Sequence, residues 1–204
     1  MQDALLSAER EARGVVDVMA LPAVPSDAHI VLWQGDITRL NADAIVNAAN
    51  SALLGCFIPC HRCIDNAIHS AAGLQLRAAC AALMEGQGHP EATGTAKITA
   101  GYNLPARHVL HTVGPIVSGA LTEEHRQLLA SCYRSCLALA AKHGLKSVAF
   151  CCISTGEFHF PNEAAAEIAV REVRAFLAEN TSVERVVFNV FKDADLHIYE
   201  RLLL

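Results

Sequence analysis

Two kinds of hydrophobic pattern alternate along the chain and predict its secondary structure. Short apolar runs, such as Ala44-Ile45-Val46-Asn47-Ala48, are typical of strands buried on both faces of a sheet. Longer segments in which charged residues form a solvent-exposed face are typical of helices. Strands are expected at 29–33, 44–48, 108–113, 147–153 and 185–191, and helices at 5–19, 64–84, 122–143, 162–180 and 194–203. This alternation predicts an α/β fold with a mixed sheet.

A proline-containing segment divides the chain into two parts. Residues 22–27, Pro-Ala-Val-Pro-Ser-Asp, break the helical pattern and are typical of a linker. Residues 1–26 are therefore interpreted as an N-terminal helical extension with its linker, and residues 27–204 as the main domain. A chain of 204 residues, 52% of them hydrophobic, suits one compact domain better than two.

The charge and hydropathy of the chain exclude several classes of function. The net charge is −5 and there is no long run of Lys or Arg, so the basic footprint of a nucleic-acid-binding protein is absent. No segment approaches the roughly 18 apolar residues that span a bilayer. The first 20 residues carry several charges and no apolar core of signal-peptide type, so we expect a cytoplasmic protein without a membrane partner.

The eight cysteines fall into two groups. Five lie in apolar runs, where Cys behaves as a small hydrophobe, and are expected to be buried free thiols. These are Cys80, Cys132, Cys136, Cys151 and Cys152. The other three, Cys56, Cys60 and Cys63, share one loop with His61, and surface loops are where functional sites usually lie.

Thiolates beside a histidine predict a zinc site in this loop. His61 and Cys63 are two residues apart, so an extended backbone places both side chains on one side. Cys56 lies five residues before His61, far enough for the loop to fold back. The predicted ligands are therefore Cys56, His61 and Cys63, which leave a fourth position for water or substrate, as in catalytic zinc sites.

Other interpretations of the loop remain open. A Cys60 thiolate in the fourth position would close the site and make it structural. Cys60 and Cys63 also have the Cys-x-x-Cys spacing of a redox pair, although the thioredoxin context is missing. A loop without a chemical function is the third alternative.

Polar residues at the ends of the predicted strands suggest ligand contacts. Asp36 can accept a hydrogen bond from an exocyclic amine, or it can cap a turn. Asn47 and Asn50 follow a buried strand, where an amide costs energy unless it is paired. The hydroxyl groups of a ribose would pair them, whereas ordering of the loop backbone is the alternative for Asn47. The loop at 153–161 offers backbone N–H groups to an anion, although it is not a Walker loop.

Taken in order, these motifs resemble the macrodomain family, whose members bind ADP-ribose. The resemblance covers about residues 29–204 and rests on Gln34-Gly35-Asp36-Ile37-Thr38, Ala44-Ile45-Val46-Asn47-Ala48-Ala49-Asn50, Ile64-Asp65-Asn66-Ala67-Ile68-His69, Leu110-His111-Thr112-Val113-Gly114-Pro115 and Ile153-Ser154-Thr155-Gly156. Where the common hydrolase pattern has a run of glycines, this chain has the thiol loop, 55–63. That loop resembles the zinc-dependent branch, found in microbes beside a sirtuin ADP-ribosyltransferase and a lipoate-carrier protein, whose members carry an N-terminal helical extension.

The resemblance implies a three-layer α/β/α fold with the ligand in a cleft at the crest of the sheet. It implies Asn50 and Asp65 as catalytic residues facing the distal ribose, with zinc beside that ribose. Asp36 would hold the adenine amine, Phe191 would lie near the base, and the loop from Ser154 to Phe158 would cradle the diphosphate. The ligand-binding residues implied in this way are Asp36, Ile37, Asn47, Ser154, Thr155, Gly156, Glu157, Phe158 and Phe191.

The resemblance also implies a reaction, the zinc-dependent removal of mono-ADP-ribose from acidic side chains of modified proteins. The expected partners are ADP-ribose, a mono-ADP-ribosylated protein such as a lipoate-carrier protein, and a sirtuin-type ADP-ribosyltransferase. Two alternatives use the same pocket. One is a non-catalytic ADP-ribose reader with a structural zinc, and the other is an esterase that deacetylates O-acetyl-ADP-ribose.

Overall fold

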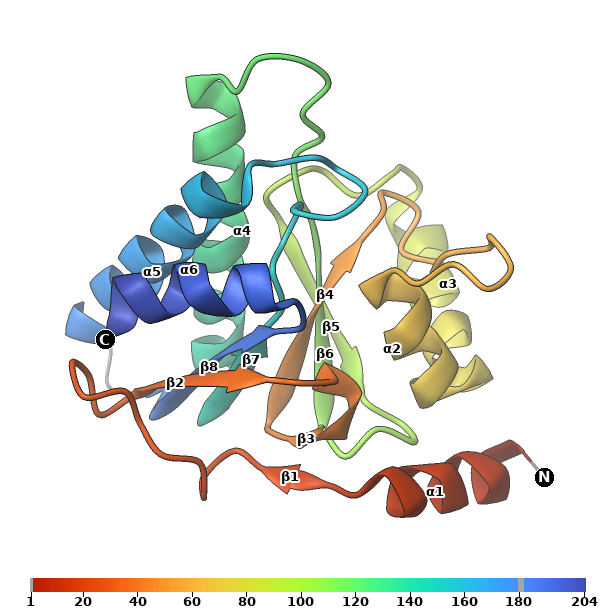
Figure 1. Ribbon diagram of the computed structural model, residues 1–204. Coiled ribbons are helices and arrows are strands. Elements are labelled where there is room, and N and C mark those ends of the chain that lie inside the picture. The colour runs from red at the N-terminus through yellow and green to blue at the C-terminus, as the bar shows by residue number, and fades with distance from the viewer. Residues whose placement is uncertain (1, 180–181) are drawn as a thin grey trace.

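A six-stranded sheet in the order β2-β8-β7-β4-β6-β5 forms the centre of the computed structural model, which describes residues 2–179 and 182–204 (Figure 1). All neighbouring strands are parallel except β5, which runs antiparallel to β6. The strands are β2 (Ile30–Gln34), β4 (Ala44–Ala49), β5 (Ala96–Ala100), β6 (His108–Val113), β7 (Ser147–Phe150) and β8 (Arg185–Val190). Their central members are almost entirely buried, as the continuous apolar runs predict.

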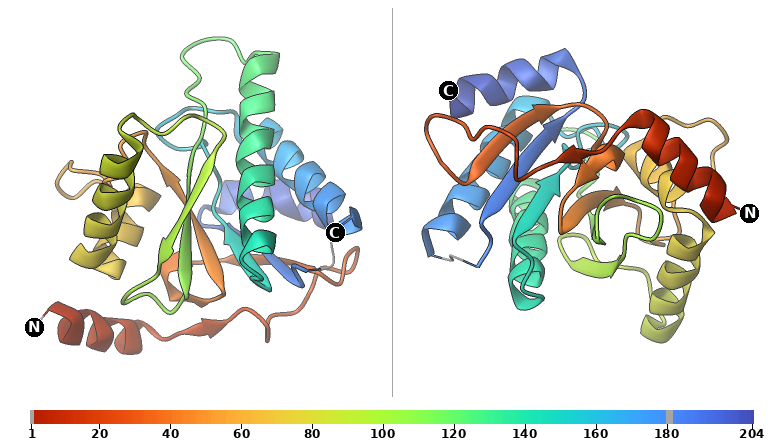
Figure 2. Two further views of the ribbon diagram at one scale, coloured as in Figure 1. Left: turned by 180° about the vertical axis from the view of Figure 1, so that it is seen from behind. Right: turned by 90° about the horizontal axis from the view of Figure 1, so that it is seen from below.

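Helices cover both faces of this sheet, which confirms the three-layer α/β/α fold (Figure 2). On one face lie α2 (Ile64–Ala72) and α3 (Leu74–Gln87). On the other lie α4 (Glu123–Lys142), α5 (Asn162–Glu179) and α6 (Asp193–Leu203). The core is filled by Val, Ile, Leu and Ala with a few aromatic rings, such as those of Tyr133 and Phe150, whose centroids lie 4.9 Å apart.

The structure corrects several predicted boundaries. The single helix expected at 64–84 is divided into two at Gly73. This residue has a φ of +94°, which glycine adopts without strain, and it ends α2 before α3 begins. The strands expected at 147–153 and 185–191 end earlier, at Phe150 and Val190. The edge strand β5 was not predicted. The helix expected at 162–180 is described only to Glu179, because residue 180 lies outside the described residues.

The N-terminal segment differs from the expected helix at 5–19. Helix α1 (Gln2–Arg13) ends before Gly14, and β1 (Val16–Asp17) then pairs in parallel with β3 (Leu40–Asn41). No residue of α1 is buried, and its contacts with the main body include polar ones, as between Gln75 Nε2 and Asp3 Oδ1 at 2.7 Å. Val18 and Val24, by contrast, are buried in the common core, so the linker is part of the packed structure.

The parallel strands place several loops at one edge of the sheet. Strands β2, β4, β7 and β8 all lead from their carboxyl ends into loops that carry residues singled out from the sequence. In open α/β sheets this edge is where ligands usually bind. No helix within the described residues is long and apolar enough to cross a membrane.

Candidate functional site

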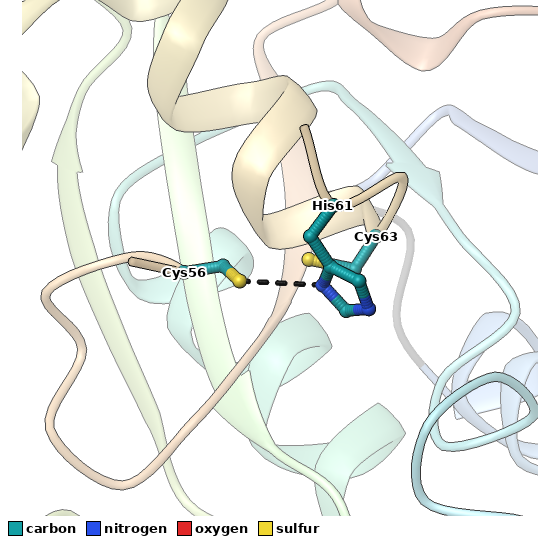
Figure 3. A group of neighbouring side chains, drawn as sticks. All are labelled: Cys56, His61 and Cys63. Carbon is teal, nitrogen blue, oxygen red and sulfur yellow. Dashed lines mark hydrogen bonds between the residues drawn. The ribbon is translucent and has the colours of Figure 1, made fainter. Parts of the chain in front are cut away.

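The thiol loop, residues 55–63, brings one imidazole and two thiols together. Cys56 Sγ lies 3.3 Å from His61 Nδ1, and the potential ligand atoms of Cys56, His61 and Cys63 all lie within 4.8 Å of one another (Figure 3). All three side chains are partly buried. Cys60 is exposed and is not part of this group, and its φ of +60° turns the backbone at that point.

The start of α2 fixes the second half of this loop. Cys63 is the N-cap residue of α2, and its sulfur accepts a hydrogen bond from the backbone N–H of Asn66 at 3.4 Å. The side-chain amide of Asn66 donates to the carbonyl oxygen of His61 at 2.7 Å. His61 and Cys63 are thus held by one residue of the first helical turn, which orients both toward Cys56.

These three donors fit a zinc ion. Zinc bonds of roughly 2.3 Å to sulfur and 2.0–2.1 Å to nitrogen, at tetrahedral angles, put a sulfur and a nitrogen about 3.5 Å apart. The distance of 3.3 Å between Cys56 Sγ and His61 Nδ1 is close to that value. Burial raises the pKa of the Cys63 thiol, so a cation must displace its proton in order to bind. Two thiolates and one imidazole are the protein ligands of one known class of catalytic zinc site.

Asp65, on the first turn of α2, is held by two asparagines from the end of β4. Asn47 donates to Oδ1 at 2.8 Å, and Asn50 donates to Oδ2 at 3.3 Å. Asn50 also donates to the carbonyl oxygen of Gly55 at 3.1 Å, which links Asp65 directly to the start of the thiol loop. Burial raises the pKa of Asp65, an effect that the hydrogen bond from Asn47 partly opposes. The carboxylate, the asparagines and the thiol loop therefore form one connected site.

Asn47 does not face the open edge of the sheet. Its side chain is completely buried, and besides Asp65 it contacts Nδ1 of His111 at 3.2 Å. Because the amide donates to Nδ1, the ring proton of His111 lies on Nε2, 2.9 Å from the hydroxyl of Thr99. The structure thus places Asn47 behind Asp65, where its partners are side chains and not the ribose or the loop backbone considered from the sequence.

A second group of potential ligands, His69, Cys80 and His111, lies deeper in the same network. Burial lowers the pKa of His69 to about 4 and that of His111 to about 3, and it raises that of Cys80 to about 11. These groups are therefore neutral, and a thiolate ligand is disfavoured. Gly55 packs on His69 so closely that a Cβ atom there would lie 2.9 Å from Cγ of the ring. We assign this group to the support of Asp65 and the thiol loop.

Asp36 caps the short 3-10 helix η1 (Ile37–Arg39) after β2. Its Oδ1 accepts from the backbone N–H and the hydroxyl of Thr38, at 2.9 and 2.7 Å. Asp36 also lines a cavity of about 400 Å³, together with residues of α1 and α2. Ile37 is buried, so its side chain is closed to a ligand. Phe191, at the end of the neighbouring strand β8, is 75% exposed.

The loop after β7 presents backbone donors. Within the described part of the chain, the N–H groups of Gly156, Glu157 and Phe158 donate to no carbonyl oxygen or side chain. Ser154 has a φ of +65°, and its buried hydroxyl has no partner. Gly114 lies so close to it that a Cβ atom would overlap the hydroxyl oxygen. Such a loop can receive an anion.

Some functional contacts were not predicted from the sequence. Arg13 Nη1 lies 3.4 Å from Asp36 Oδ2, and Glu157 Oε1 lies 3.3 Å from His61 Nε2. Neither pair has a sequence signature, because each joins segments that are far apart in the chain. His111 could have been found, since a histidine within an apolar strand needs buried hydrogen-bond partners.

Known proteins resemble this chain in sequence and in fold. The family model described as Macro domain matches residues 46–169. A protein-ADP-ribose hydrolase of Treponema medium is 59% identical over 84% of this chain and 66% of its own length. A protein-ADP-ribose hydrolase of Staphylococcus aureus is 53% identical over 98% of this chain and 75% of its own length. The macrodomain of Trypanosoma brucei in complex with ADP-ribose superposes with a TM-score of 0.81, at 38% identity, over 100% of this chain and 87% of that one.

Proposed function

The chain belongs to the Macro domain family, and from this premise we propose that it hydrolyses the bond between ADP-ribose and modified proteins. The names of its relatives in Treponema medium and Staphylococcus aureus support this reaction. We propose mono-ADP-ribose on acidic side chains as the substrate. The observation that carries the proposal is the connected site of Asp65, Asn50 and the thiol loop at the ligand-binding edge of the sheet.

ADP-ribose would lie across the carboxyl ends of the parallel strands. The adenine amine donates to Asp36, whose Oδ2 is not used in capping, and the exposed ring of Phe191 offers a face for stacking. The free N–H groups of the loop from Ser154 to Phe158 receive the diphosphate. This order brings the distal ribose to the thiol loop, where Asn50 and Asp65 stand.

Asp65 and Asn50 bind and orient the distal ribose. Each oxygen of Asp65 accepts one hydrogen bond from an asparagine, and each keeps a lone pair that can accept from a ribose hydroxyl. Asn47 acts from behind by fixing the carboxylate, which is why its burial is compatible with a role in the site. Precise orientation of the scissile bond contributes to catalysis, since a displacement of about 1 Å can lower a rate 100-fold.

Zinc is the proposed cofactor, held by Cys56 Sγ, His61 Nδ1 and Cys63 Sγ. The separation of these donors and the exposed position of Cys60 favour a site with three protein ligands. A zinc ion in such a site supplies Lewis-acid chemistry, which polarises an oxygen atom. From the resemblance of the thiol loop to the zinc-dependent branch of macrodomains, we propose a sirtuin-type transferase as the enzyme that adds the modification and a lipoate-carrier protein as its target.

The proposal is tested by incubating the protein with a substrate mono-ADP-ribosylated on Asp or Glu. Mass spectrometry should detect free ADP-ribose and the substrate protein without its modification. Tight binding of ADP-ribose without any release would contradict hydrolysis and indicate a reader. Faster turnover of O-acetyl-ADP-ribose than of the modified protein, in parallel reactions, would indicate the esterase.

A further inference from the structure

The two ring nitrogens of His61 face groups from two different loops. Nδ1 lies 3.3 Å from Cys56 Sγ in the thiol loop, and Nε2 lies 3.3 Å from Oε1 of Glu157. Glu157 belongs to the loop after β7, which is 96 residues away in sequence. The imidazole therefore bridges the loop proposed to hold the metal and the loop proposed to hold the diphosphate.

The two contacts together determine which nitrogen can bind a metal. A neutral imidazole has one N–H group and one lone pair, and only the lone pair can be a ligand. An ionised carboxylate can accept a hydrogen bond but cannot donate one, so Glu157 favours the tautomer of His61 with hydrogen on Nε2. The lone pair then lies on Nδ1, the nitrogen that faces Cys56. Partners of this kind fix the orientation of metal-binding histidines in general.

The contact also explains how a glutamate can lie within a loop that receives an anion. A carboxylate directed at a diphosphate would repel it, since like charges oppose one another. In the structure the side chain turns toward His61, while the backbone N–H groups of Gly156 to Phe158 have no partner among the described residues. Glu157 was expected to bind the ligand. In this geometry its backbone N–H can contact the ligand, while its side chain contacts His61.

The pair contributes little to folding by itself. The Glu157 side chain is 66% exposed and that of His61 is 24% exposed. Even a charged pair at the surface typically stabilises a protein by less than about 1 kcal/mol, and a contact with a neutral imidazole is no stronger. Removal of the carboxylate is therefore expected to leave the fold intact, so that its effect on metal binding can be measured separately.

We propose that Glu157 is a positioning residue for the metal site, which holds His61 with Nδ1 directed at the zinc ion. This inference rests on the zinc site proposed above and adds a residue outside the ligand set. The contact also connects the metal site with the diphosphate loop. Loss of such a partner typically weakens metal binding by about 10- to 100-fold.

The test is a comparison of zinc affinities, measured by competition with a chromogenic zinc chelator at one fixed pH. Glu157→Ala should bind zinc about 10- to 100-fold more weakly than the parent. Glu157→Gln should recover most of the loss, because its amide oxygen can still accept the proton of Nε2. Glu163→Ala is the matched control, because Glu163 has the same 66% exposure, pairs with Arg201 and lies on α5. Its zinc affinity should equal that of the parent.

Four results would overturn the proposal. Equal zinc affinities of the parent and Glu157→Ala would show that the carboxylate does not position His61. Equal losses in the Ala and Gln variants would show that hydrogen bonding is not the cause. A parent that binds no zinc would overturn the metal part of the proposed function as well, so the two failures can be distinguished. Melting curves of all variants should be alike, and a collapsed Glu157→Ala variant would indicate a structural role instead.

Discussion

The guanidinium group of Arg13 lies 3.4 Å from Oδ2 of Asp36, and this contact joins the N-terminal helix to the proposed adenine end of the cleft. The other carboxylate oxygen, Oδ1, is used by Thr38 in capping η1. The sequence left two interpretations of Asp36 open, a turn cap and a ligand contact. The structure shows that one oxygen serves as the cap while the second pairs with Arg13, and Asp36 lines a cavity, so capping and a ligand contact are compatible.

Replacing Asp36 should weaken the binding of ADP-ribose. A hydrogen bond between the adenine amine and a charged carboxylate contributes about 1.5–3 kcal/mol, so Asp36→Ala should raise the Kd roughly tenfold or more. Asp36→Asn should have a Kd similar to that of Asp36→Ala. Its melting temperature should be closer to that of the parent, because its amide oxygen can still cap η1. Isothermal titration calorimetry on both variants is the measurement. An unchanged Kd in both would restrict Asp36 to capping.

The two neighbouring cysteines should differ in their effect on zinc content. Cys63 lies close to Cys56 and His61, whereas Cys60 is exposed and apart from them. Cys63→Ala should therefore empty the site, while Cys60→Ala should keep about one zinc per chain. Atomic absorption on the purified variants measures this directly. Loss of zinc from Cys60→Ala would show that the site is closed by a fourth thiolate.

Asn50→Ala should lower turnover while zinc stays bound. The variant loses the hydrogen bonds to Asp65 and to the carbonyl oxygen of Gly55, so the carboxylate and the loop lose their common anchor. We expect a decrease in kcat of about tenfold or more, since small displacements at the reacting centre are costly. Single-turnover release of ADP-ribose should be measured together with zinc content. Full activity would show that Asn50 does not orient the ribose.

The buried histidines should make the protein less stable in weak acid. Unfolding raises the pKa of His69 from about 4, and that of His111 from about 3, to about 6.5. Their contribution to stability is complete above pH 6.5 and is lost progressively as the pH falls toward 4, because only the unfolded chain takes up the protons. Urea titrations at pH 7 and pH 5 should show this decrease.

A variant separates this effect from other titrating groups. His69→Gln keeps hydrogen-bonding capacity but does not ionise, so its free energy of unfolding should fall less between pH 7 and pH 5 than that of the parent. Identical decreases in the two proteins would show that His69 does not contribute to the pH dependence.

The alternation of apolar runs was sufficient to predict the sheet and the class of fold, because buried strands and half-buried helices have different periods. It was not sufficient at Gly73, since a helix that ends and restarts around one glycine keeps its apolar pattern on both sides. Strand β5 lies at the sheet edge and is only partly buried, so its sequence, Ala-Lys-Ile-Thr-Ala, has no strong apolar signal.

The thiol loop could be predicted because its three donors lie within eight residues. The partner of His61 in another loop, and the partner of Asp36, could not be predicted. Glu157 reaches His61 only because β7 and β4 are neighbours in the sheet, and Arg13 reaches Asp36 only because α1 folds back on the domain. Asn47 was expected to contact the ligand because an amide at a strand end needs partners, but Asp65 and His111 provide them.

The central claim is that zinc serves the chemistry of this site and is not needed for folding. The sheet has a large apolar core of its own, unlike a small domain that unfolds without metal. The most direct test removes zinc with a chelator and measures zinc content, release of ADP-ribose from a modified protein and the melting curve on the same sample. We predict that release is abolished while a cooperative thermal transition remains, and that added zinc restores release. Full activity after verified removal of zinc would contradict the account, and loss of the folded state would favour a reader with a structural zinc.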